Sequence, residues 1–189
     1  MPIISDIDFL SKNYDKKSTY AQENPSVKLV CVETDENGNV IRESYETGAQ
    51  ITFEYDSIGN LVLEACDADG DKTIEYYEKY KYEYSASGSL SKCYFAKLKE
   101  NVDEFNWQFI SEYDENGNLV KVSNDYEGDG NIDLVEEFGP NNTKTKTVYD
   151  KNGNKINVQY YVYDCDGNIV SSKFDKDGDG SIEYENFQK

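Results

Sequence analysis

Apolar and polar residues alternate with a period of two along most of this chain. Tyr80, Tyr82 and Tyr84 share one side of their segment with charged residues between them, and residues 105–113 and 156–163 alternate in the same way. Turn signals interrupt the alternation at intervals of roughly a dozen residues, a pattern typical of strands joined by hairpins. The sequence therefore predicts an all-β chain, an antiparallel β-meander of about a dozen strands. The meander would form an open twisted sheet, a flattened barrel or a spiral.

One turn motif recurs along the chain. Its copies are TDENGNVI from Thr34, YDSIGNLV from Tyr55, YDENGNLV from Tyr113, YDKNGNKI from Tyr149 and YDCDGNIV from Tyr163. All of them contain Asp-x-x-Gly-Asn. A two-residue type I′ turn would require a positive φ at Ile58, which is strained for a β-branched residue. A type I turn followed by a glycine bulge fits every copy, so we expect three-residue hairpin loops in which the aspartate caps the turn.

A second, acidic motif follows three of these turns at a fixed distance. Asp67 comes twelve residues after Tyr55 and opens DADGDKTIE. Asp125 opens DYEGDGNID and Asp175 opens DKDGDGSIE, each twelve residues after the tyrosine of its own turn. Identical spacing in three compound units indicates duplication.

The N-terminal segment has a different pattern. Ser5 is a candidate N-cap for a short helix whose Ile4, Ile7, Leu10 and Tyr14 fall on one side. We expect a helical capping segment over residues 1–26 that covers one end or edge of the sheet, and a tandem hairpin domain over residues 27–189.

Composition limits the chemistry available to the chain. The formal net charge is −19 and histidine is absent. The negative charge disfavours nucleic acid and anionic membrane surfaces. Without histidine, the Ser-His-Asp and Cys-His mechanisms and histidine-ligated zinc are excluded, and no carboxylate pair stands out as catalytic, so we expect no enzymatic activity. Four cysteines show no close pairing, and nothing in the sequence selects a disulfide.

Targeting signals do not fix a compartment. No apolar run is long enough for membrane insertion. The start, MPIISDIDFLSKNYD, lacks the continuous apolar core of a signal peptide. Cytosolic residence, export without a cleaved signal, and excision from a longer protein all fit this observation.

The acidic motifs have the oxygen-ligand pattern of calcium loops, in which positions 1, 3, 5, 7 and 9 supply carboxylates and one backbone carbonyl. The alternative is that they are polar turns descended from a metal-binding ancestor. The candidate ligands are Asp67, Asp69, Asp71, Thr73 and Glu75 in the first loop, Asp125, Glu127, Asp129, Asn131 and Asp133 in the second, and Asp175, Asp177, Asp179, Ser181 and Glu183 in the third.

Two details refine these sites. If the loops run directly into strands, a residue at position 12 cannot return to the ion, and the sites would be weak, with Kd near about 10⁻⁴–10⁻³ M. Lys72 occupies a position that is glycine in the other two loops, which places a cation beside the ligands and a side chain that does not readily adopt a positive φ. We therefore expect the Asp125 and Asp175 loops to bind calcium best.

Taken together, hairpins such as FEYDSIGNL and YVYDCDGNI resemble the YD-repeat (RHS-type) family of bacterial surface and toxin-shell proteins. The interleaved DxDGDGxxD loops resemble calcium-type loops of repetitive bacterial proteins and, locally, those of EF-hands, dockerins and thrombospondin type 3 repeats. The likeness covers roughly residues 34–189 and implies an extracellular or cell-surface structural module.

The expected function is thus that of a non-catalytic module of a bacterial surface or exported protein. Calcium would stabilise it, and its sheet would face a protein or glycan partner. Rows such as Tyr80, Tyr82 and Tyr84 are candidate stacking platforms for sugars, but we expect these tyrosines rather to pack as cross-strand pairs. The alternative is a cytosolic acidic interaction protein, similar to an antitoxin, that binds a basic partner. The sequence does not determine the oligomeric state.

Overall fold

The computed structural model describes residues 18–99, 101–102 and 104–187. The recurrent turn folds as its residues predict. At Asp35, the carboxylate accepts the backbone N–H groups of Asn37 and Asn39, both at 2.8 Å. Gly38 takes the positive φ of 84° and donates its N–H to the Asp35 carbonyl. Thr34 pairs with Val40 but Glu33 pairs with Arg42, so Ile41, just after the turn, forms an additional bulge. The turns at Asp56, Asp114, Asp150 and Asp164 repeat this geometry, and the predicted hairpin loop is confirmed.

Over the described residues, one short helix and thirteen strands follow each other along the chain. They are α1 (Thr19–Glu23), β1 (Leu29–Thr34), β2 (Val40–Tyr45), β3 (Gln50–Tyr55), β4 (Leu61–Asp67), β5 (Tyr76–Tyr84), β6 (Leu90–Leu98), β7 (Phe109–Tyr113), β8 (Leu119–Asn124), β9 (Leu134–Gly139), β10 (Thr143–Tyr149), β11 (Lys155–Tyr163), β12 (Ile169–Asp175) and β13 (Tyr184–Phe187).

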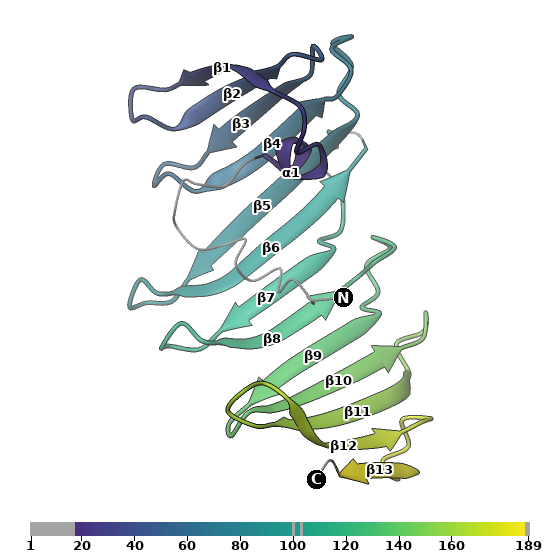
Figure 1. Cartoon of the computed structure of the whole chain (residues 1–189). Coiled ribbons are helices and arrows are strands. Elements are labelled where there is room, and N and C mark those ends of the chain that lie inside the picture. Colours follow the sequence, from purple (N-terminus) through teal and green to yellow (C-terminus); the bar gives the residue numbers. More distant parts are fainter. Residues whose placement is uncertain (1–17, 100, 103, 188–189) are drawn as a thin grey trace.

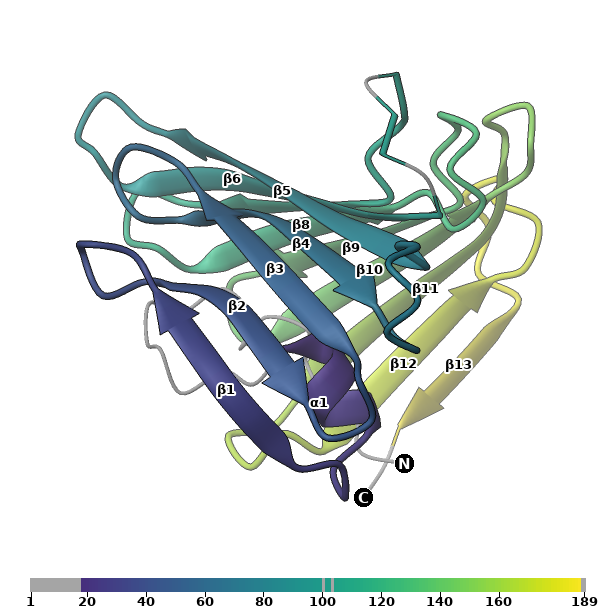
Figure 2. The ribbon, with the colours of Figure 1, turned by 90° about the horizontal axis from the view of Figure 1, so that it is seen from above.

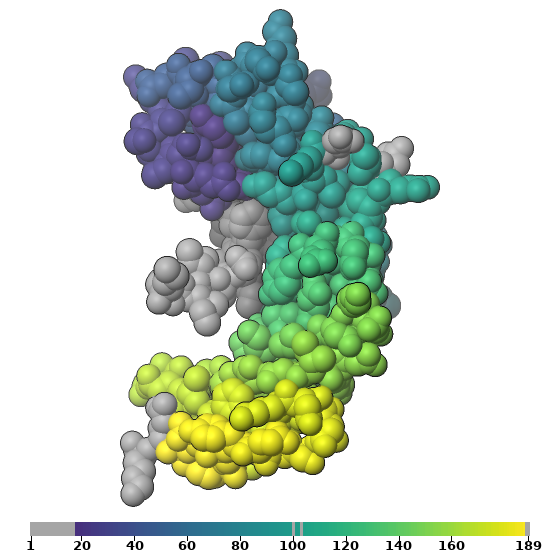
Figure 3. All heavy atoms as spheres, turned by 90° about the vertical axis from the view of Figure 1, so that its right-hand side faces the viewer, coloured from purple at the N-terminus to yellow at the C-terminus, as the bar shows by residue number. Residues whose placement is uncertain are grey.

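The strands form a single open sheet in which spatial order equals chain order (Figure 1). Every neighbouring pair is antiparallel, so the all-β meander is confirmed, and of the three predicted forms it is the open sheet. The sheet is strongly curled, and α1 lies inside the curve (Figure 2). From the side, both ends of the sheet project toward the same side of the molecule (Figure 3).

The connections between strands lie in two rows because successive antiparallel strands reverse direction. We name the row that contains the β4–β5, β8–β9 and β12–β13 connections the acidic rim, since all three acidic motifs lie there. The opposite row, the turn rim, contains the Asp35, Asp56, Asp114 and Asp164 turns. The Asp150 turn joins β10 to β11 and therefore belongs to the acidic rim.

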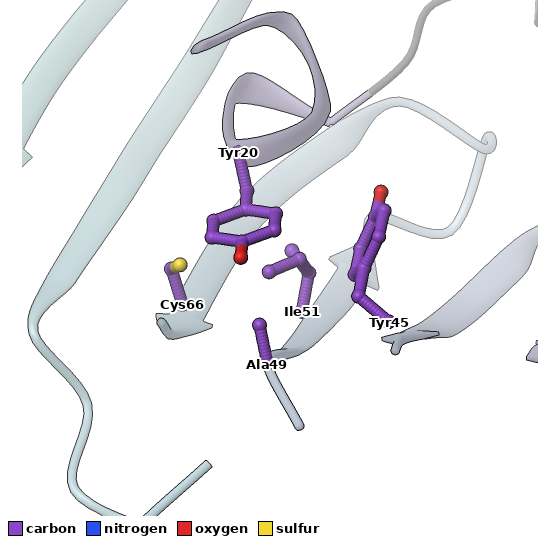
Figure 4. Close-up of a cluster of buried hydrophobic side chains, with 5 residues drawn as sticks. All are labelled: Tyr20, Tyr45, Ala49, Ile51 and Cys66. Atoms are coloured by element: carbon purple, nitrogen blue, oxygen red, sulfur yellow. The ribbon is translucent and has the colours of Figure 1, made fainter. Parts of the chain in front are cut away.

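A compact hydrophobic cluster lies where α1 meets β2, β3 and β4 (Figure 4). Tyr20 of α1 packs against Tyr45, Ala49, Ile51 and Cys66, and the rings of Tyr20 and Tyr45 are 4.9 Å apart. Ile51 and Cys66 are fully buried. The helix therefore covers a face of the sheet at its N-terminal end. The predicted helix that begins near Ser5 lies outside the described residues.

Further along the sheet, cross-strand ring contacts take the place of a thick core. Tyr80, Phe95 and Phe109 stack across β5, β6 and β7, with centroids 5.3 and 5.7 Å apart. Such aromatic pairs stabilise neighbouring strands beyond the area that they bury. Tyr161 and Phe174 make a similar contact between β11 and β12.

Tyr80 is 4% exposed, donates its hydroxyl to Glu78 and packs against Phe95 of the neighbouring strand. Tyr80, Tyr82 and Tyr84 therefore do not form an exposed stacking row, and the expected cross-strand packing is confirmed at Tyr80. One local expectation is wrong. The strand predicted across residues 105–113 begins at Phe109. Trp107 precedes it and packs against Tyr94, with ring centroids 5.6 Å apart.

Candidate metal sites

The first aspartate of each acidic loop is buried and organises the loop around itself. Asp175, which is 1% exposed, accepts Gly178 N at 2.7 Å on one carboxylate oxygen and Gly180 N at 2.9 Å on the other. Asp67 and Asp125 make the equivalent pairs of hydrogen bonds in their own loops. A carboxylate oxygen has two lone pairs, so the oxygens of Asp67 and Asp175 each keep one for an ion. One oxygen of Asp125 also accepts the Asp129 N–H at 3.2 Å, which occupies both of its lone pairs.

The last acidic residue closes each loop. Glu183 accepts the backbone N–H of Lys176 at 2.7 Å, and its own N–H donates to Phe174 O at 2.9 Å. Glu75 and Asp133 close the first and second loops through the same two contacts. The three loops therefore share one hydrogen-bonding scheme, which explains why the motif keeps its spacing.

Two of the loops bring four carboxylates together. Each of these residues offers an oxygen within 4.8 Å of the others, and the groups are Asp67, Asp69, Asp71 and Glu75, and Asp175, Asp177, Asp179 and Glu183. In both groups the first aspartate is buried and the other three side chains are exposed. Four like charges at this separation repel one another, and a cation between them offsets the repulsion.

The Asp125 loop shows no such cluster among the described residues. Asp129 accepts the backbone N–H of Asn131 at 2.8 Å and its side-chain amide at 3.1 Å, so both carboxylate oxygens bind the loop itself. Glu127 replaces the shorter aspartate at the third position and is exposed. The geometry thus favours the Asp67 loop over the Asp125 loop, the reverse of the order expected from the sequence.

The conformation of Lys72 explains in part why the Asp67 loop is better formed than expected. Its φ is 76°, so it adopts the left-handed conformation that Gly130 and Gly180 adopt in the other loops, with φ of 90° and 95°. Its N–H donates to Asp67 at 3.0 Å. The expectation that lysine would not take this conformation is wrong, because the loop's hydrogen bonds impose it.

The residues predicted to supply a backbone carbonyl are held in the loops by their N–H groups. Thr73, Asn131 and Ser181 donate their N–H groups to the carboxylate two residues earlier, at 2.6, 2.8 and 2.7 Å. Residues at position 12 do not return to the loops. Glu78 lies in β5, and Glu136 in β9 pairs with Lys144. The loops therefore depend on positions 1 to 9.

Each acidic loop packs against the connection that precedes it on the acidic rim. A methyl group added at Gly70 would lie 2.7 Å from the Gly48 carbonyl oxygen, and one at Gly178 would lie 2.6 Å from the Lys155 carbonyl oxygen. In the middle loop, the Asn106 side chain donates to Gly128 O at 3.0 Å. Neighbouring connections thus hold the loops in place.

The loops are separated along the acidic rim by four strands each, which corresponds to about 19 Å at the usual strand spacing. This separation exceeds the roughly 8 Å screening length of physiological salt, so ions at the different loops would bind independently. Carboxylates and carbonyls without nitrogen or sulfur donors suit a hard cation, and the flexible set of exposed oxygens suits Ca²⁺ better than Mg²⁺ with its strict octahedron.

Sequence reasoning missed a buried polar network on β4 and β5. Glu64 is 3% exposed and Glu78 is 2% exposed, and the two residues are direct cross-strand partners. Thr19 of α1 hydrogen bonds to both carboxylates. A signal was present in the sequence, because Glu64 stands in the otherwise apolar run LVLEAC and period two places it on the same face as Cys66.

The fold and its loops define a β-rich repeat module of tandem hairpins. A family model described as a protein of unknown function (DUF2963) matches residues 101–148, about a quarter of the chain, which contain one turn motif and the Asp125 loop. None of the curated proteins matches the chain in sequence.

Several solved structures match this chain at low similarity. The TcdB2-TccC3 structure is 10% identical, with a TM-score of 0.30, over 82% of this chain and 12% of that one. A protein of unknown function from Bacteroides fragilis is 11% identical, with a TM-score of 0.25, over 88% and 96%. The Tc holotoxin pore of Photorhabdus luminescens is 10% identical, with a TM-score of 0.18, over 77% and 12%. This chain thus spans about an eighth of the TcdB2-TccC3 chain.

Within residues 18–99, 101–102 and 104–187, no helix has the length and apolar character needed to cross a membrane.

Proposed function

We propose that this protein is a non-catalytic, calcium-stabilised repeat module of an exported or cell-surface bacterial protein, and that its sheet is presented to a protein or glycan partner. The observation that carries the proposal is the acidic rim. One loop design occurs three times on the same side of the sheet, and two of the copies gather four carboxylates within 4.8 Å. The resemblance of the turns to YD repeats supports the bacterial surface context.

The proposed compartment follows from the strength of such sites. Loops that use positions 1 to 9, without a bidentate ligand at position 12, belong to the weak class with Kd of about 10⁻⁴–10⁻³ M. Sites of this strength fill at the millimolar calcium found outside cells. At about 1 mM calcium and a Kd of about 10⁻⁴ M, each filled site would stabilise the fold by about 1.4 kcal/mol.

Thermal unfolding in calcium, magnesium and chelator tests the metal part of the proposal. We expect the Tm to rise with calcium from about 0.1 to 5 mM, and magnesium at equal ionic strength to have a smaller effect. Asp177→Asn should reduce the calcium-dependent rise, since Asp177 belongs to the Asp175 cluster.

Asp166→Asn is the matched control, because Asp166 is an exposed residue of the Asp164 turn and lies outside both clusters. It changes the net charge by the same amount and should retain the full calcium response. Equal melting temperatures in calcium and chelator, or equal losses in the two variants, would rule out calcium binding at the loops.

A second candidate function is suggested by the net charge of −19 and by the concentration of carboxylates on one rim. In this alternative the protein is a cytosolic acidic module that binds a basic partner, for which electrostatic attraction would accelerate association. Affinity capture with the whole chain from native cells, at two salt concentrations, separates the alternatives. A stoichiometric basic protein that is lost at high salt favours the second function.

A further inference from the structure

Helix α1 lies over two carboxyl groups that face each other across neighbouring strands. Glu64 on β4 and Glu78 on β5 are register partners, and both are almost completely buried. Two ionised carboxylates in directly opposite positions destabilise a sheet, and burial away from water makes the repulsion stronger. The arrangement is favourable only when something compensates one of the charges.

The compensation falls mainly on Glu78. Its carboxylate accepts hydrogen bonds from the Tyr80 hydroxyl at 2.8 Å and the Thr19 hydroxyl at 3.0 Å, and Lys97 Nζ lies 3.2 Å away. Glu64 accepts the backbone N–H of Thr19 at 3.2 Å. Thr19 thus bridges both carboxyl groups, and the first residue of α1 is seated directly on the pair.

We propose that α1 is a proton-controlled cover, which stays docked on the sheet while Glu64 is protonated and is released as Glu64 ionises. Release would remove Tyr20 from the pocket that Tyr45, Ala49, Ile51 and Cys66 form (Figure 4). An apolar patch at the N-terminal end of the curled face would then become accessible.

The electrostatics of the site favour docking of α1 when Glu64 is protonated. Burial raises the pKa of Glu64 to about 8, the charges of Glu78 and Glu43 add to the increase, and the Thr19 N–H and Lys97 oppose it. Release of α1 would return water to Glu64 and lower its pKa toward the ordinary value of 4.5. The docked state therefore binds the proton more tightly, and docking weakens as pH rises from about 4.5 to about 8.

Other ionisable groups surround Glu64 on every side. They are Glu23 of α1, Glu43 and Tyr45 of β2, Cys66 of β4, Tyr76, Glu78 and Tyr80 of β5, and Lys97 of β6. Burial raises the pKa values of Tyr45, Tyr76 and Tyr80 above the ordinary value of 10.0, and that of Cys66 to about 11. Burial thus keeps these four groups from titrating below pH 8.

Cys66 is a natural reporter of release because it lies directly under Tyr20 and is 0% exposed. The exposed Cys31 and Cys165 are first replaced by serine in the full chain. Labelling of Cys66 by a maleimide is then followed from pH 5.5 to 8.5, and each rate is divided by that of a free thiol at the same pH. The quotient measures the open fraction. Cys93, 3% exposed in the middle of the sheet, reports global opening instead.

We expect the open fraction of the wild-type sheet to rise at least about tenfold between pH 6 and 8, since one proton is linked to docking. Glu64→Gln keeps an oxygen for the Thr19 N–H and carries no charge, so its open fraction should change less than about twofold over the same range. Glu54→Gln, an exposed position on the opposite face of β3, should behave as wild type.

Three results would overturn the proposal: a wild-type open fraction that does not depend on pH, a Glu64→Gln variant that keeps the full rise, or labelling of Cys93 in parallel with Cys66. The last result would mean that the whole sheet opens. The wild-type pH series is decisive even if a variant fails to fold.

Discussion

Replacing Lys72 with glycine should stabilise the protein. Lys72 has a φ of 76°, while the equivalent Gly130 and Gly180 adopt similar angles without a side chain. The left-handed conformation costs an L-residue about 1–2 kcal/mol, and glycine loses about 0.5–1 kcal/mol through its greater freedom in the unfolded chain. The expected net gain is about 0.5–1 kcal/mol, or a Tm increase of about 1–4 °C for a chain of this size.

A second variant separates the backbone from the charge. Lys72→Ala removes the positive charge that Lys72 brings to the loop but keeps a Cβ atom at the strained angle, so it should not produce the gain. Urea unfolding in chelator, with both variants and wild type fitted to a shared m-value, measures the difference. Because Lys72→Ala and Lys72→Gly carry the same charge, their difference isolates the backbone conformation.

If the two variants have equal stabilities, the conformational argument for Lys72 is wrong. In calcium, both variants should show a larger stabilisation than wild type, because the loop then carries one positive charge fewer in competition with the ion.

Other predictions address the glycines and the carboxyl groups. Gly70→Ala should reduce the free energy of unfolding in urea by about 2–5 kcal/mol, because its Cβ would lie 2.7 Å from Gly48 O at a positive φ. The Cβ of Gly117→Ala meets open space, so this variant should lose only about 1–2 kcal/mol. Equal losses in the two variants would contradict the packing argument. The raised pKa of Glu64 predicts that the free energy of unfolding falls as pH rises from 4.5 to about 8. This fall should be much smaller in Glu64→Gln. An equal fall in both proteins would mean that another group causes it. The pKa of Asp114 lies below its ordinary value of 3.8, mainly through the Asn118 side-chain hydrogen bond. Its contribution to stability is therefore present above pH 3.8 and is lost as pH falls through the lowered pKa. In thermal melts between pH 7 and 2.5, the Tm of Asp114→Asn should fall less steeply than that of wild type, and an equally steep fall would count against the role of Asp114 as a turn cap.

The parts of the fold that could be predicted from the sequence are those that local chemistry determines. The turn at Asp35 is one example, because its hydrogen bonds join residues at most four positions apart and Gly38 supplies the positive φ. The acidic loops are another, since Asp175 binds amides only three and five residues away. The alternation of apolar and polar residues between such turns then predicts the antiparallel meander.

The remainder depends on contacts between distant residues. The seat of α1 requires Thr19 to meet Glu64 and Glu78, which are separated from it by 45 and 59 positions. The choice of an open sheet over a closed barrel depends on whether β1 and β13 pair, and no local residue determines that. At Lys72, the loop's hydrogen bonds overrode the residue's own conformational preference.

The acidic loops follow β4, β8 and β12, so the duplicated unit contains four strands. Since four is even, gain or loss of a whole unit in the gene leaves the direction of every later strand unchanged. Each added copy would extend the same line of carboxylates by one place. Gain or loss of one or three strands would reverse the direction of every later strand and place the later acidic loops on the opposite side of the sheet. The number of whole units is therefore the property that this architecture can vary most freely.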